Sequence, residues 1–87
     1  MNVSRKVPVF LKFTLKSLRI RSGLSQEKAA EKLGISRDTL RRWERDSGNL
    51  DIKSIDNLCR LYKVPRDYIF FGRDTALSVI LKKEEVS

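Results

Sequence analysis

The sequence has no histidine and only one cysteine among its 87 residues. Cys59 therefore has no second thiol in the chain with which to form a disulfide. Zinc sites are built mainly from cysteine and histidine ligands, and histidine is the most common general acid–base catalyst. The composition argues against a zinc site and against most enzyme classes. We expect no catalytic residue, no metal and no other cofactor.

Long apolar runs are also missing. The most hydrophobic N-terminal stretch, residues 7–18, is interrupted by Lys12 and Lys16. Such a stretch is too short for a membrane span and too charged for a secretory signal. We therefore expect an intracellular protein that has no membrane partner.

Positive charge, by contrast, is abundant and unevenly placed. Residues 1–45 carry twelve basic and four acidic side chains, whereas residues 46–87 carry seven of each. The whole net charge of +8 therefore belongs to the first half of the chain. This asymmetry favours a polyanionic partner, either nucleic acid or an anionic surface. A chain of this length buries only about 60–65% of its unfolded surface, which is enough for one small domain.

Glycines and capping residues divide the chain into short helical segments. We predict an all-α fold: a compact bundle of five short helices, preceded by an arm at 1–10 and followed by a tail at 73–87. The predicted helices occupy residues 11–22, 26–33, 37–45, 51–62 and 65–71. Two points stay open. Residues 11–15 alternate as a strand would, and the tail fits either a helix or a strand.

The third predicted helix has two chemically different faces. At 100° per residue, five of its charged side chains fall within an arc of about 140°, and they are Arg37, Asp38, Arg41, Arg42 and Arg45. The opposite side carries Leu40 and Trp43, which we expect to lie in the core. The helix before it contains the small residues Ala29 and Ala30 and ends at Gly34. Small residues let two helices cross closely, so the basic helix would project outward, as a major-groove reader does.

Five stretches of the sequence, at residues 18–26, 29–36, 39–44, 58–64 and 67–69, resemble the Cro/C1-type helix-turn-helix domain of phage and bacterial repressors. The resemblance covers roughly residues 14–71 and implies a five-helix lambda-repressor-like bundle. Matched position by position, it implies three groups of functional residues. Those expected to read bases are Arg37, Asp38 and Arg42. Those expected to hold DNA phosphates are Gln26, Ser36, Arg41 and Arg45. A structural ion pair is expected between Arg19 and Glu44.

The residue types agree with these roles. Arginine reads guanine O6 and N7 with two hydrogen bonds, and a carboxylate accepts from cytosine N4. An alternative role for Asp38 is a pair with Arg42 one turn along the helix. The loop at residues 45–49 is longer than the tight turn of the family, which argues against phosphate contacts from that loop.

We therefore expect a sequence-specific regulator of transcription that inserts helix 36–45 into the major groove of double-stranded DNA. We expect it to be a nucleoid-associated bacterial repressor from a phage or mobile element. A homodimer reading a pseudo-palindromic operator is expected, joined through Leu77, Ile80 and Leu81. The alternative is an antitoxin or adaptor that binds another protein through residues 74–85. Exposed basic rather than apolar residues on the third helix favour the regulator.

Overall fold

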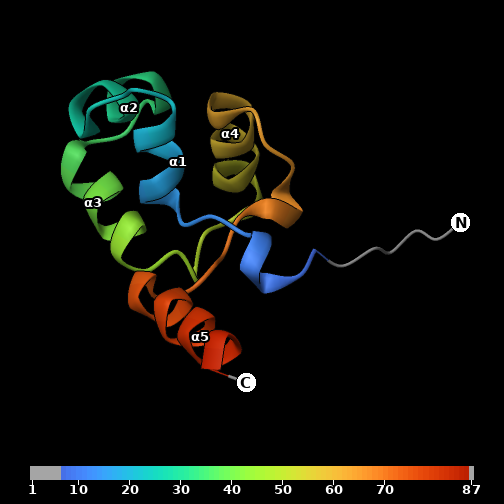
Figure 1. The fold of residues 1–87 in the computed structure, drawn as a ribbon. Coiled ribbons are helices and arrows are strands. Elements are labelled where there is room, and N and C mark those ends of the chain that lie inside the picture. Colours follow the sequence, from blue (N-terminus) through green and yellow to red (C-terminus); the bar gives the residue numbers. More distant parts are fainter. Residues whose placement is uncertain (1–6, 87) are drawn as a thin grey trace, which may run out of the picture.

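The computed structural model of the chain describes residues 7–86, so most of the N-terminal arm, at residues 1–6, lies outside the description. Within the described part the fold is all-α, as predicted, with five α-helices and two short 3₁₀ turns (Figure 1). The helices are α1 (Leu15–Arg21), α2 (Gln26–Leu33), α3 (Arg37–Arg45), α4 (Ile52–Tyr62) and α5 (Asp74–Val86). The 3₁₀ turns are η1 (Val9–Leu11) and η2 (Arg66–Tyr68). None of these helices is long and apolar enough to cross a membrane.

Each of the first four helices begins after a side-chain cap. Thr14, Ser25, Ser36 and Asp51 each accept a hydrogen bond from the backbone N–H three residues further on. Such a cap satisfies a donor that the helix itself leaves unpaired and stabilises the helix by about 1 kcal/mol. Gly34 ends α2 in the left-handed conformation, with φ of 72°, which a side chain would disfavour. The short turn that follows leads directly into α3.

The first helix is shorter than predicted. It begins at Leu15 rather than at residue 11, and Phe13 instead forms a parallel bridge with Ile69. The backbone N–H of Phe13 donates to the Tyr68 carbonyl, and the Phe13 carbonyl accepts from the Phe70 N–H, each at 2.8 Å. Residues 12–14 of the alternating segment are thus extended, whereas Leu11 belongs to η1.

The predicted fifth helix at residues 65–71 is wrong. Only η2 forms there, because Ile69 and Phe70 leave the helical path to pair with Phe13. The fifth α-helix of the described chain is α5, formed by the tail whose shape the sequence left open. The number of helices is as predicted, but the last one lies elsewhere in the sequence.

The core fixes α3 against α2 and the rest of the bundle. Ala29 and Leu40 are fully buried where α2 meets α3, and Trp43 packs against this cluster as well as against the larger one. The larger cluster comprises Leu15, Leu18, Leu58, Tyr62 and Ile69. A small side chain at position 29 allows the close approach that sets the angle of α3. One face of α3 is thereby held inward and the other outward.

The segment just before α5 is hydrogen-bonded to the loop just after α3. The Ser47 N–H donates to the Gly72 carbonyl at 2.9 Å, and the Gly72 N–H donates to the Ser47 hydroxyl at 3.1 Å. Further along, α5 contacts η1, and the two lie together at the end of the molecule away from α2 (Figure 1). Leu77 is only 6% exposed there. It was expected to contribute to a dimer surface, but it is buried within its own chain.

Candidate nucleic-acid interface

The outward face of α3 is formed by long charged side chains. All five of the side chains that the helical period places together are exposed, namely Arg37, Asp38, Arg41, Arg42 and Arg45. Leu40 and Glu44 of the same helix are buried, by contrast. Because α2 is packed behind α3 through Ala29 and Leu40, the cationic face is held outward as a ridge.

Two side-chain pairs order this ridge. Asp38 forms an exposed ion pair with Arg41 at 3.4 Å, not the pair with Arg42 that the sequence suggested as an alternative. Arg42 instead donates to the Thr39 hydroxyl at 3.3 Å. Among the side chains that the structure describes, at residues 7–83, none forms an ion pair or a hydrogen bond with that of Arg37. Its guanidinium donors are therefore available to a ligand.

Behind the ridge lies a buried polar network. Arg19 Nε donates to Glu44 Oε2 at 2.6 Å and Arg19 Nη2 donates to Oε1 at 3.4 Å, with side chains only 11% and 5% exposed. Arg19 Nη1 also donates to the Leu24 carbonyl at 3.0 Å. The structure thus brings together the two residues that were expected to pair. The pair ties α1 to α3 and to the loop before α2.

Gln26 belongs to the same network, which the sequence did not indicate. Its Nε2 donates to Glu44 Oε1 at 3.1 Å. The two residues are 18 positions apart, and only the packing of α2 on α3 brings them together. Gln26 is the first residue of α2, so the free N–H groups and positive dipole end of that helix lie beside it.

Tyr62 also lies near the Arg19–Glu44 pair. The pKa of its hydroxyl is raised to about 12, mainly by burial and also by the negative charge of Glu44, while Arg19 opposes the shift. Among the described residues, the buried hydroxyl has no hydrogen-bond partner. The phenol therefore stays neutral at physiological pH. Sequence periodicity placed Tyr62 in the core but gave no sign of this proximity.

A hollow of about 190 Å³ opens next to Gln26, and we name it the cationic hollow. Its lining residues come from α1, α2, α3 and the start of α5, and they are Lys16, Gln26, Arg41, Glu44, Arg45 and Asp74. Three of the four residues expected to hold phosphate meet here. Sequence reasoning missed Lys16 and Asp74, since neither lies near the others in the chain. Because Arg19 already pairs with Glu44, the three cations face one uncompensated carboxylate, that of Asp74.

Ser36, the fourth expected phosphate ligand, lies elsewhere, at the N-terminus of α3. Its hydroxyl accepts from the Thr39 N–H at 3.0 Å and donates to the Thr39 hydroxyl at 2.9 Å. The side chain is exposed, but its main contact is with its own helix. Ser36 therefore acts first as a cap, and any phosphate it meets would lie apart from the cationic hollow.

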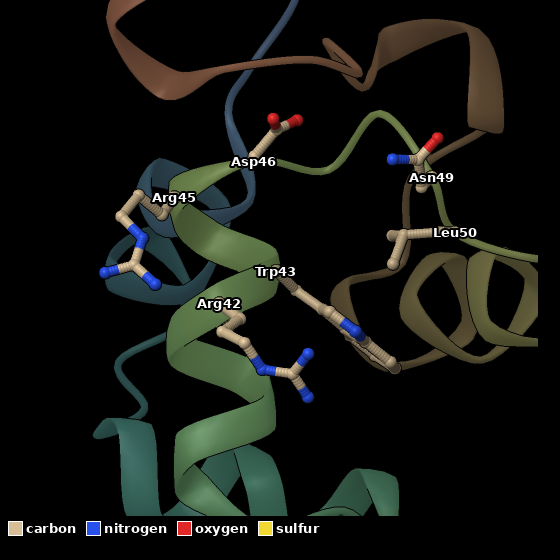
Figure 2. Close-up of a pocket in the computed structure, with 6 residues that line it drawn as sticks. All are labelled: Arg42, Trp43, Arg45, Asp46, Asn49 and Leu50. Atoms are coloured by element: carbon tan, nitrogen blue, oxygen red, sulfur yellow. The ribbon is translucent and has the colours of Figure 1, made fainter.

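A second hollow, of about 320 Å³, lies at the C-terminal end of α3 (Figure 2). Figure 2 shows Arg42 and Trp43 on one side of the helix and Arg45 on the other, with Asn49 and Leu50 across the gap. Asp46 points away from Arg42 there. Its carboxylate accepts from the Gly48 N–H at 3.0 Å, so it stabilises the loop. The charge of Arg42 is thus not neutralised by this loop.

Comparison with known proteins agrees with this geometry. A family model described as helix-turn-helix matches residues 15–69, which include α1 to α4 and η2. A similar protein is the HTH-type transcriptional regulator ImmR of Bacillus subtilis (strain 168), 40% identical over 60 residues. The match covers 69% of this chain but 46% of ImmR, so the chain spans less than half the length of that relative. The extent of the family match shows that the chain belongs to the helix-turn-helix family of the Cro/C1 type.

Proposed function

We propose that the protein is a sequence-specific regulator of transcription that represses by occupying double-stranded DNA with α3 in the major groove. The observation that carries this proposal is the ridge of exposed arginines on α3, held outward by the packing of α2. A major groove about 12 Å wide admits one α-helix, and this helix offers the donors that base edges accept. Family membership and the similarity to the transcriptional regulator ImmR support the same conclusion.

The two ends of α3 would have different roles. Arg37 at the first turn and Arg42 one turn later would read guanine. Asp38 would accept a hydrogen bond from cytosine in addition to its ion pair with Arg41. The cationic hollow would take a backbone phosphate, which Gln26, Arg41 and Arg45 would hold. Phosphate contacts fix register without carrying sequence information. Lys16 adds a further charge that attracts any DNA.

Selection from a pool of random double-stranded DNA tests the proposal directly. The expected result is one enriched sequence motif, which competes with unrelated DNA for binding. Recovery of no motif, together with equal affinity for all duplexes, would overturn sequence-specific regulation. Preference for single strands would point to another class of nucleic-acid partner, against which the absence of exposed aromatic residues on α3 argues.

The cationic hollow leads to a prediction about non-specific affinity. Gln26→Ala should weaken the best operator and unrelated DNA alike, by about tenfold, because it removes a hydrogen bond to a charged phosphate. Arg41→Ala should weaken both and lower the slope of log affinity against log salt by about one. The measurement is a fluorescence anisotropy titration of both DNAs across a salt series.

Asp74→Asn is a matched variant that should change DNA affinity in the opposite direction. Neutralising the one uncompensated carboxylate of the cationic hollow should raise affinity for both DNAs by about two- to threefold. Circular dichroism would verify that α5 is retained. Unchanged affinity in Gln26→Ala and Asp74→Asn together would show that phosphate does not enter the hollow.

A dimer is the expected assembly, since one α3 contacts too few base pairs for specificity in a genome. Ile80 and Leu81 of the expected surface are half-buried, and the exposed apolar side chains nearby are Phe10, Leu11 and Val79. Val79→Lys should therefore weaken self-association and turn a two-half-site footprint into single half-site protection. Sedimentation equilibrium and footprinting measure the two effects. A wild-type protein that is monomeric at high concentration and protects one half-site would contradict the dimer.

The same exposed residues support a second candidate, an antitoxin or adaptor that docks another protein on α5. DNA binding would then be secondary. The candidates differ in how they depend on α3, since Val79→Lys would abolish partner capture while Arg37→Ala would leave it intact. Operator binding without any co-purified protein favours the regulator.

A further inference from the structure

We infer that Glu44 is a positioning residue for DNA-backbone binding, which fixes the Gln26 amide at the cationic hollow while Arg19 holds Glu44 in place. The inference rests on the proposed function, because it concerns how the phosphate contact is prepared. Glu44 would touch no DNA itself. The buried ion pair would then have a second role besides joining α1 to α3.

The Glu44 carboxylate determines which end of the Gln26 amide faces it. An ionised carboxylate only accepts hydrogen bonds, whereas a glutamine amide has a donor end and an acceptor end. Glu44 Oε1 therefore selects the orientation in which Nε2 faces it, at 3.1 Å. The opposite orientation would place an amide oxygen against a carboxylate oxygen. One N–H is used by Glu44, and the second N–H of Nε2 remains for an anion in the hollow.

Arg19 makes this arrangement compatible with an anionic ligand. A bare carboxylate at the wall of the hollow would repel phosphate, but Arg19 donates to both Glu44 oxygens, at 2.6 and 3.4 Å. Arg19 is in turn held by the Leu24 carbonyl at 3.0 Å. With side chains 11% and 5% exposed, the two charges compensate each other away from water. Glu44 still lines the hollow, but Arg19 offsets its negative charge there.

Preorganisation gives the arrangement its value. A free glutamine side chain would have to give up its rotamer freedom when it binds phosphate, and a side chain already held does not. Glu44 therefore acts on affinity only through Gln26. This is a statement about coupling, and a double-mutant cycle measures it.

The cycle compares the wild type, Gln26→Ala, Glu44→Gln and the double variant, each bound to unrelated duplex DNA. Glu44→Gln keeps the shape of residue 44 and retains one oxygen that can accept from Arg19. It replaces the oxygen that accepts from Gln26 with an amide donor. It should lower affinity by about threefold to tenfold when Gln26 is present. When Gln26 is already alanine, the same change should lower affinity by less than about twofold. Equal effects in the two backgrounds would overturn the inference.

Stability is separated from positioning by a second readout. Urea denaturation identifies conditions in which every variant is folded, and affinities are compared only there. Gln26 is the sole glutamine of the chain, so its side-chain amide signals in a ¹H–¹⁵N spectrum are assigned by their loss in Gln26→Ala. They should report a rigid amide in the wild type, in contrast to exposed Asn49, and a mobile one in Glu44→Gln, where the double variant identifies the signals of the second glutamine that the substitution adds.

The outcomes are distinct. Should Glu44→Gln fail to fold, Glu44→Asp, which withdraws the carboxylate from Gln26 while keeping its charge, takes its place in the cycle. A wild-type Gln26 amide as mobile as that of Asn49 would overturn the inference without any DNA. Absence of DNA binding in the wild type would instead refute the proposed function, and it would leave the amide measurement as an independent answer.

Discussion

Arg37→Ala should weaken binding to the best operator by tenfold or more and leave affinity for unrelated DNA almost unchanged. Arg37 is exposed at the start of α3, and among the described residues no side chain pairs with it. A good bidentate contact from arginine to guanine is worth about 1–3 kcal/mol of discrimination against the wrong base. That energy is lost only where the correct base is present. Titration of both DNAs at one salt concentration measures the difference.

The control for this prediction must remove the same charge elsewhere. Arg60 lies exposed on α4, outside the ridge on α3, so Arg60→Ala reports the general effect of one lost cation. It should reduce both affinities slightly and equally. If Arg37→Ala also lowers both affinities equally, Arg37 is a phosphate contact. Specificity would then come from Arg42, from Asp38 or from the shape of the DNA.

Local signals were sufficient to predict the helix-turn-helix unit. Ser25, Ser36 and Asp51 each mark a helix start, because a capping side chain acts on a backbone donor only three residues away. Gly34 marks the turn between α2 and α3 for an equally local reason. The exposed face of α3 follows from the helical period once the helix is known. These features depend on nothing distant in the chain.

The predictions of helix position failed where the local structure depends on contacts with distant segments of the chain. Residues 65–71 have helical signals, but pairing of Ile69 and Phe70 with Phe13 overrides them after η2. The same pairing delays the start of α1. Residues 74–86 stayed ambiguous because their shape depends on contact with η1. Tertiary contacts outweighed weak local preference in each case.

The candidate site shows the same division. The single-helix part, the arginines of α3, was available from sequence. The cationic hollow was not, because Lys16, Gln26 and Asp74 come from three different helices. The hydrogen bond from Gln26 to Glu44 likewise follows from the packing of α2 on α3. Helical periodicity in a sequence cannot predict contacts between side chains from separate elements.

Removing one member of the Arg19–Glu44 pair should lower the free energy of unfolding by about 3 kcal/mol or more. Among the described residues, Glu44→Leu leaves the Arg19 guanidinium with the Leu24 carbonyl as its remaining hydrogen-bond partner. Arg19→Met leaves the Glu44 carboxylate with Gln26 alone, in surroundings only 5% exposed. A buried charge without its partner retains its desolvation cost, and that cost produces the loss. Urea denaturation followed by circular dichroism measures it.

The double replacement separates this cause from simple loss of packing. Arg19→Met combined with Glu44→Leu removes both charges and keeps similar apolar volume, so it should cost much less than either single change. A constant dependence of the unfolding free energy on urea would show that the variants share one unfolded state. The double variant should also lose the rigid Gln26 amide, and with it affinity for DNA, while its stability recovers. Small and equal losses of stability in all three variants would mean that solvent screens the pair. The contact between α1 and α3 would then not depend on it.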